Sequence, residues 1–465
     1  MDPNPLTPFV QSNLESLAWF RPELALTAGV VVLLVLDLVW RRSPARSARL
    51  TVAALAVLGA AAALLWLQPE APRPLFNGMI ASDKLATFFK WLFLGAGAVT
   101  VVVTALGSEL APARRGEFYA LLAAIVLGMF LMASASDLLM MYLAIELVSM
   151  TSYVLAGFRK ADRRATEAAL KYVIYGGVAS GVMLFGMSYL YGLAGTFSFS
   201  ELGAALAGAL QGTGPALAGG RLAVVAGLAF VAAGIGYKVA AVPFHMWCPD
   251  VYEGAPTPFT AFLSVGPKAA GFALAVRFFL EVFPAHAAPG GALSAVPWPA
   301  VLGIVAAVTM TLGNLVAIVQ SNLKRLLAYS SIAHAGYTLM GLAAATTAGM
   351  QSVLIYLAVY LVMNLGAFVV VMRVAAATGS ESILDYRGLV RREPIIAITF
   401  VVFLLSLTGL PPFAGFIGKW YLFTAVWEQV EGPGGGWYAV LLLVAALNTA
   451  VSLYYYARII RAMFL

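Results

Sequence analysis

Long apolar stretches alternate with short polar segments along almost the whole chain. A helix needs about 20 mainly apolar residues to cross the hydrocarbon core of a bilayer, and each stretch supplies enough of them. The pattern therefore predicts an all-α fold, a polytopic transmembrane helical bundle with about 13 spans. The predicted spans lie near residues 23–40, 50–67, 85–106, 117–134, 137–158, 166–192, 221–247, 257–283, 299–319, 324–344, 349–374, 395–430 and 436–460.

Basic residues fall between the predicted spans, and nearly all of them follow an odd-numbered span. The loops after even-numbered spans hold little beyond Arg73, Lys84 and Arg221. Because cytoplasmic loops carry an excess of Lys and Arg, this asymmetry predicts that the N-terminus faces outward. The predicted inner loops carry the basic clusters at residues 41–49, 114–115, 159–164, 324–325, 387–392 and 458–461.

Composition narrows the function classes. Hydrophobic residues make up 62% of the 465 positions and charged residues 11%, whereas soluble domains have roughly a quarter charged residues. The inner loops account for the net charge of +7, so nucleic acid is not a predicted partner. The single cysteine, Cys248, excludes a disulfide framework, a Cys-ligated iron–sulfur cluster and a CxxC pair. Only three histidines are present, His245, His286 and His334. We therefore expect neither a metal nor a cofactor in this chain.

Several charged residues lie inside predicted spans, where each costs about 2.5–3.5 kcal/mol or more at the bilayer centre. Lys238, Lys268 and Lys419 lie in spans 7, 8 and 12, and Glu146 lies in the middle of span 5. The alternative for a lysine is snorkelling, in which the long stem carries the amine to the interface. For Glu146 the alternative is a structural ion pair with one lysine. Lys171, at the inner end of span 6, is the weakest candidate, because snorkelling explains it equally well.

Buried ammonium groups of this kind suit proton transfer. A low dielectric disfavours the charged form of a lysine, and an approaching carboxylate favours it again, so the two groups together form a switchable proton holder. His245 follows Lys238 by seven residues and would share its helix face, and His334 lies in the middle of span 10. An imidazole titrates near neutral pH and suits transfer between lysines, although a neutral, hydrogen-bonded histidine is the simpler alternative.

Prolines interrupt the helices near these lysines. Pro243 follows Lys238 by five residues, and Pro411-Pro412 precede Lys419. Pro267 comes directly before Lys268. A proline removes a helix hydrogen bond, which a membrane tolerates only where protein or water satisfies the freed carbonyl. We therefore expect spans 7 and 12 to be broken helices.

The two broken spans also suggest internal symmetry. Spans 7 and 12 are five spans apart and therefore run in opposite directions, and Glu146 and His334 lie in spans 5 and 10 with the same offset. This placement predicts two inverted five-helix repeats, as in many transporters. The predicted divisions are residues 1–116 for spans 1–3, 117–283 for the first repeat and 299–462 for the second.

Three motifs carry a family resemblance. KVAAVPFHMWCPDVYEGAP (238–256, followed by Lys268), NLKRLLAYSSIAHAGY (322–337) and GLPPFAGFIGKWYLF (409–423) resemble the antiporter-like subunits of respiratory complex I. The PDVYEGAP motif is most similar to the subunit N branch, the counterpart of mitochondrial subunit 2. The likeness implies a proton-translocating membrane subunit of an NADH:quinone oxidoreductase in a bacterial inner (plasma) membrane. It implies other membrane-arm subunits as partners, together with lipid, protons and internal water.

The resemblance also assigns roles to individual residues. It implies that Glu146 pairs with Lys238, that Lys268 is the central lysine, and that Lys419 leads to the outer half-channel. His245 and His334 match relay histidines. The resemblance places the NADH, flavin, iron–sulfur and quinone chemistry in other subunits, and quinone reduction there would drive the protons across.

The sequence differs from the subunit N branch in one respect, and two other classes of membrane protein would carry similar residues. The subunit N branch has a fourteenth span, and this sequence stops at Leu465 just after the thirteenth, so we expect a missing last span. An Mrp-type cation/proton antiporter would carry the same buried charges, but it would move Na⁺ or K⁺ without a quinone reductase. A purely structural membrane subunit is the other alternative, although costly charges retained at matched depths count against it.

Overall fold

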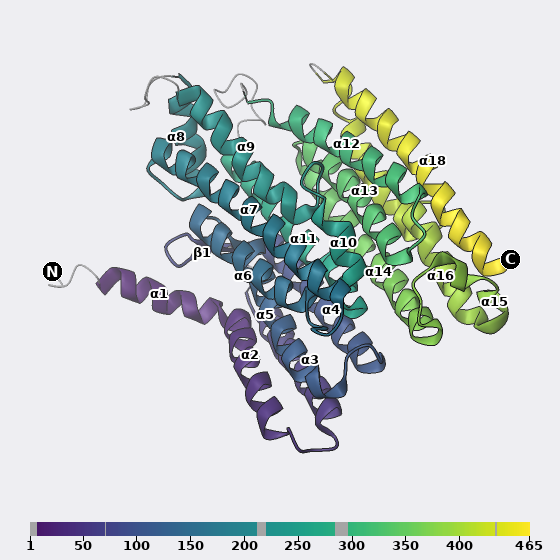
Figure 1. The fold of residues 1–465 in the computed structure, drawn as a ribbon. Helices are drawn as coiled ribbons and strands as arrows, with labels where there is room; N and C mark the ends of the chain where they lie inside the picture. The colour runs from purple at the N-terminus through teal and green to yellow at the C-terminus, as the bar shows by residue number, and fades with distance from the viewer. Residues whose placement is uncertain (1–6, 70, 212–219, 284–295, 433–434) are drawn as a thin grey trace.

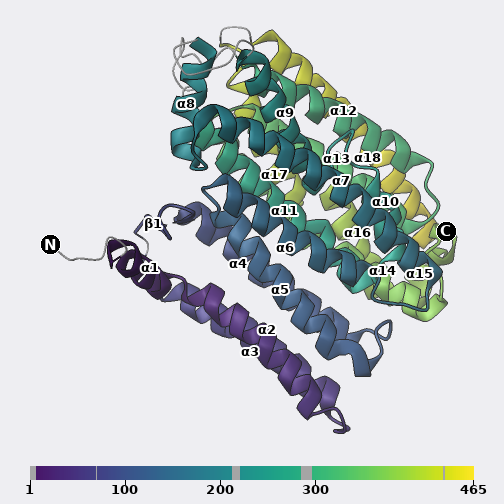
Figure 2. The ribbon, with the colours of Figure 1, turned by 60° about the vertical axis from the view of Figure 1, so that its left-hand side comes forward.

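The computed structural model describes residues 7–69, 71–211, 220–283, 296–432 and 435–465, and His286 lies outside them. It is a bundle of long helices with a thin layer, α2 and α3, along one edge (Figures 1 and 2). Within the described residues, eleven helices are long and apolar enough to cross a membrane. The polytopic helical fold predicted from the hydrophobic pattern is therefore confirmed.

The N-terminal part holds the edge layer and a small hairpin. Strands β1 and β2 pair antiparallel between the third and fourth helices. The elements are α1 (Thr7–Trp19), α2 (Arg21–Val39), α3 (Arg46–Trp66), β1 (Arg73–Leu75), β2 (Ile80–Ser82), α4 (Lys84–Leu106), the 3₁₀ turn η1 (Pro112–Arg114) and α5 (Arg115–Ser134).

The middle part contains the first broken span and the most deeply buried helix. Its elements are α6 (Leu138–Ala156), α7 (Arg163–Ala194), α8 (Phe199–Gln211), α9 (Gly220–Val239), α10 (Trp247–Gly254) and α11 (Thr257–Val282). The last part contains the second broken span. Its elements are α12 (Trp298–Ile318), α13 (Leu323–Ala343), α14 (Thr347–Thr378), η4 (Ile383–Tyr386), α15 (Leu389–Arg392), α16 (Pro394–Thr408), α17 (Ala414–Trp427) and α18 (Gly436–Phe464).

A helix, or a pair of helix halves, lies at every predicted span. Two of the predicted spans are not among the eleven that qualify by length and apolarity. One is α13, which carries Lys324, Arg325 and His334. The other is the pair α16 and α17, which are 15 and 14 residues long. The count of 13 spans, the inverted repeats and the three-part division of the chain stay predictions.

Both breaks predicted from the prolines are present, and the two helices before them end in the same way. At the end of α9, Ala240 has φ 59°, and the N–H of Ala241 donates to the carbonyl of Gly236 across 2.8 Å. At the end of α16, Gly409 has φ 86°, and the N–H of Leu410 donates to the carbonyl of Leu405 across 3.2 Å. In both cases a residue in the left-handed conformation is followed by a 6→1 backbone hydrogen bond, the Schellman motif. This bond satisfies a carbonyl that the end of a helix would otherwise leave free.

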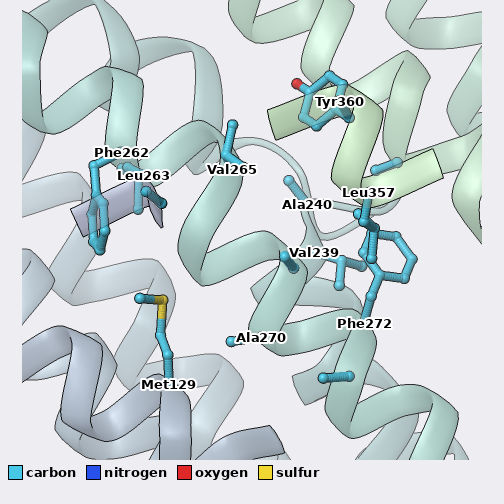
Figure 3. Packing of buried hydrophobic residues seen from close by; sticks show 14 of the residues in the cluster. Met129, Val239, Ala240, Phe262, Leu263, Val265, Ala270, Phe272, Leu357 and Tyr360 are labelled. Carbon is cyan, nitrogen blue, oxygen red and sulfur yellow. The ribbon is translucent and has the colours of Figure 1, made fainter. Parts of the chain in front are cut away.

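The core centres on α11. All residues of its apolar 18-residue stretch are buried. This helix packs against α4, α5, α9 and α14. Figure 3 shows its side chains Phe262 and Val265 among Met129 of α5, Val239 of α9 and Leu357 of α14, with other neighbours. Because α11 has protein on all sides, the lysine that it carries is placed inside the bundle.

Candidate functional site

Lys238 lies at the end of α9, one residue before the helix terminates, and its side chain is buried. Its Nζ donates a hydrogen bond to Oγ of Ser149 on α6 across 3.0 Å. Its stem packs beside Gly271 of α11, where an added Cβ would lie 3.2 Å from Cγ of Lys238. The first break therefore delivers this ammonium to the junction of three helices.

Glu146 lies one helical turn before Ser149 on α6, so the direct Glu146–Lys238 ion pair implied by the family resemblance is not formed here. Within the described residues Glu146 makes no ion pair, and its buried Oε1 has no hydrogen-bond partner. It still interacts electrostatically with Lys238. Ser149, three residues on along the same face, accepts the hydrogen bond from the ammonium.

Lys268 sits on α11 next to Pro267, inside the helix. Its Nζ donates to Oγ of Ser331 on α13 across 2.6 Å and lies 5.4 Å from the ring centroid of Tyr252. The thiol of Cys248 also interacts with this ammonium. An ammonium offers three donors, and here a hydroxyl, a thiol and an aromatic face surround it.

His334 lies just past the middle of α13 and is buried. Its Nδ1 shares a hydrogen bond with the hydroxyl of Tyr356 on α14 at 2.5 Å, and its Nε2 lies 3.4 Å from the hydroxyl of Tyr456 on α18. The ring interacts electrostatically with both Lys268 and Lys419. His334 therefore faces tyrosine hydroxyls from two other helices, and its role as a relay histidine stays a prediction.

Lys419 sits on α17, just after the second break. Its Nζ donates to the main-chain carbonyl of Thr408, the last residue of α16, across 2.8 Å. It also lies 4.4 Å from the ring centroid of Tyr337 on α13. The broken helix thus supplies the freed carbonyl that holds its own lysine.

His245 lies in the segment between α9 and α10, with only 9% of its surface exposed. Its Nδ1 is buried and has no hydrogen-bond partner among the described residues. It interacts electrostatically with Lys268. The shared face with Lys238 expected from a seven-residue spacing does not arise, because α9 ends between the two residues.

Lys171 belongs to a different environment. Its half-exposed side chain pairs with Glu167 and with Asp250 of α10, each at 2.7 Å, and Arg325 of α13 reaches Asp250 at 2.6 Å. Burial raises the pKa of Asp250, but hydrogen bonds from Lys171 and Arg325 outweigh it and hold the pKa below its ordinary value. These ion pairs form a partly exposed network that joins α7, α10 and α13.

Two buried lysines escaped the sequence reasoning. Lys90 on α4 pairs with Glu23 on α2 at 2.7 Å, with 5% and 1% of the side chains exposed. Lys324 at the start of α13 is fully buried and pairs with Glu381 at 3.0 Å. Lys90 carries the signal used for the other lysines, a charge inside an apolar span. Lys324 does not carry this signal, because it lies among the basic residues of a predicted loop.

The site is thus a row of ionisable groups from α6 to α17, running through the interior of a membrane-spanning bundle. No cluster of three or more His, Cys, Asp or Glu suited to a metal ion occurs in the part of the chain that the structure describes. These features define a polytopic membrane protein of the class in which a row of ionisable side chains lies inside the helical bundle.

The chain belongs to the NADH:quinone oxidoreductase/Mrp antiporter family of transmembrane proteins, whose sequence pattern matches residues 135–451. NADH-quinone oxidoreductase subunit N of Anaeromyxobacter sp. (strain Fw109-5) is 68% identical, and the alignment covers 98% of this chain and 89% of that protein. NAD(P)H-quinone oxidoreductase subunit 2 of Synechococcus sp. (strain JA-3-3Ab) is 44% identical, with 95% and 79% covered. The family resemblance drawn from the three motifs is confirmed.

Solved structures agree with this assignment. A chain of respiratory complex I from Thermus thermophilus with bound aureothin is 32% identical, with a TM-score of 0.75 over 95% of this chain and 90% of that one. A chain of the Mrp complex from Dietzia sp. DQ12-45-1b has the same TM-score, with 95% and 80% covered, but only 24% identity. The second likeness shows the shared fold alone.

Proposed function

We propose that this chain is the N-type, antiporter-like subunit of an NADH:quinone oxidoreductase and moves protons through its buried Lys, Glu and His groups. The observation that carries the proposal is the row of buried ammonium and imidazole groups, in which each of the three lysines is held by a neutral acceptor. Lys238, Lys268 and Lys419 each donate to a hydroxyl or a carbonyl. A lysine held in this way loses its proton more readily than one held by a carboxylate.

Redox chemistry is assigned to other subunits of the assembly. Quinone reduction there would change the charges that face this row, and the proton would then move between its members. The relatives named as subunits of NADH-quinone oxidoreductases support this assignment over an Mrp-type antiporter. We also infer that the chain lies in a bacterial plasma membrane with its N-terminus outward, on the basis of its Lys and Arg distribution.

The test uses the assembled oxidoreductase reconstituted in liposomes. Proton uptake per NADH oxidised is measured for wild type, Lys238→Ala and Lys268→Ala, with Lys160→Ala as a control at an exposed loop position. We expect the ratio to fall in the first two variants and to stay unchanged in the third. Unchanged ratios in both buried-lysine variants would overturn the proposal. Na⁺ or K⁺ movement by the chain in vesicles without a quinone reductase would favour the antiporter alternative.

A further inference from the structure

The region between Lys268 and Lys419 contains more hydrogen-bonding groups than the charged residues alone. Lys268 reaches α13 at Ser331, and Lys419 is bonded to Thr408 of α16. On α13, His334 lies between Ser331, which contacts Lys268, and Tyr337, whose ring lies 4.4 Å from the Lys419 ammonium. Neither lysine shares a hydrogen bond with His334 among the described residues, so a proton needs intermediate groups on each side of the ring.

Each ring nitrogen of His334 lies within hydrogen-bonding distance of a tyrosine hydroxyl. Tyr356 of α14 meets Nδ1 at 2.5 Å, and Tyr456 of α18 lies 3.4 Å from Nε2. Both tyrosines are fully buried. A hydroxyl both donates and accepts a hydrogen bond, so each nitrogen has a partner that fits either tautomer of the ring.

Tyr456 also connects the ring to the Lys268 side. Its hydroxyl shares a 2.5 Å hydrogen bond with Oγ of Ser330, which lies one turn before His334 on α13. Ser330 is the direct neighbour of Ser331, which accepts from Lys268. One phenol therefore bridges residues i and i+4 of α13, next in sequence to the serine that Lys268 contacts, although the two serine hydroxyls share no hydrogen bond among the described residues.

Tyr356 leads toward the Lys419 side. A Cβ added to Gly418 would lie 2.9 Å from Cδ2 of Tyr356, so α17 packs directly on this ring. Gly418 is the residue before Lys419. The phenol on Nδ1 thus lies against the helix segment that carries the next lysine.

We propose, resting on the proton-translocating function above, that Tyr356 and Tyr456 are relay residues that join the Lys268 part of the row to the Lys419 part through His334. A proton arriving from Ser330 lets Tyr456 pass its own hydroxyl proton to Nε2. The imidazolium then releases its Nδ1 proton to Tyr356, which passes its own proton onward. Each O–H bond that breaks is replaced and one proton advances, which leaves the neutral ring with its proton on Nε2 instead of Nδ1.

The experiment measures proton uptake per NADH in liposomes containing the assembled oxidoreductase. The variants are Tyr356→Phe and Tyr456→Phe, which keep the ring and remove only the hydroxyl. Tyr119→Phe is the matched control, because Tyr119 is equally buried and shares a 3.1 Å hydrogen bond with Thr51 in the N-terminal helices. Lys268→Ala is measured in parallel as the reference for loss of the row.

We expect both relay variants to lose as much proton uptake per NADH as Lys268→Ala, while Tyr119→Phe keeps the wild-type ratio. If Tyr456→Phe fails to assemble, Ser330→Ala tests the same link from the other side. Wild-type ratios in the relay variants together with a loss in Lys268→Ala would overturn this proposal and leave the proposed function standing. A wild-type ratio in Lys268→Ala would instead count against the proposed function itself.

Discussion

Lys268 of α11 and Ser331 of α13 are joined by a 2.6 Å hydrogen bond between an ammonium and a hydroxyl, both buried in the centre of the bundle. No carboxylate pairs with this lysine in the described part of the chain. The ammonium is therefore held by neutral groups and an aromatic face, which leaves its charged and neutral forms closer in energy than an ion pair would.

Replacing Ser331 by alanine removes the acceptor of the Lys268 ammonium. A hydrogen bond to a charged group contributes about 1.5–3 kcal/mol to stability, and without it the ammonium is no longer held at α13, so we expect proton uptake per NADH in the assembled oxidoreductase to fall. The measurement is proton uptake and NADH oxidation in liposomes. Ser134→Ala is the control, because Ser134 is equally buried on α5 and its hydroxyl has no partner among the described residues. Equal behaviour of the two variants would refute a role for this hydrogen bond.

Replacing Gly409 by alanine should displace Lys419. At φ 86° a Cβ would lie 2.7 Å from Cδ of the lysine, and the left-handed backbone itself costs about 1–2 kcal/mol. Gly379→Ala is the matched control, since Gly379 has φ 71° and nothing within 4 Å of the added Cβ. Thermal unfolding should show a similar loss in both variants, whereas only Gly409→Ala should lose proton uptake. A functional loss of the same size in Gly379→Ala would attribute the effect to backbone strain.

Replacing Glu23 by alanine should destabilise the layer formed by α2 and α3. The change leaves Lys90 buried without its partner, and breaking a buried ion pair from one side costs about 3–5 kcal/mol. The measurement is the midpoint of thermal unfolding in detergent. The double change Glu23→Leu with Lys90→Met should recover most of the stability, because it removes both charges together. A double variant as unstable as the single one would show that packing, not the unpaired charge, is responsible.

Replacing Lys171 by methionine should leave proton uptake per NADH at the wild-type value. Its side chain is 37% exposed, and an exposed ion pair contributes about 0–1 kcal/mol. Asp250 would keep Arg325 as its partner. The comparison with Lys268→Ala in the same liposome assay decides the point, since a matching loss would place Lys171 in the proton route.

The fold was predictable because hydrophobic periodicity and proline positions are local signals. The break after Lys238 and the break before Lys419 follow from Pro243 and Pro411-Pro412. The boundaries of helices such as α7 and α14 extended several residues beyond the apolar stretch. Polar turns at helix ends remain helical when caps satisfy them, and hydropathy does not register caps.

The candidate residues were also predictable, but their partners were not. A lysine inside an apolar span is visible in one sequence, because its cost does not depend on its neighbours. Ser149 and Ser331 lie 89 and 63 residues from the lysines they contact, and only helix packing brings them together. The pairing of Glu146 with Lys238 stays a prediction for this reason: the two groups interact electrostatically, but the Ser149 hydroxyl accepts the hydrogen bond.

The burial of α11 on every side bears on how the protein is made. Lys268 lies on this helix, and Ser331 and Asn364, which contact it from α13 and α14, are synthesised 63 or more residues after Lys268. When α11 leaves the ribosome, the Lys268 ammonium does not yet have the Ser331 hydroxyl to donate to, and lipid is a poor substitute. Stable integration of the middle of the chain must therefore wait for the C-terminal helices, which makes biogenesis depend on completing translation.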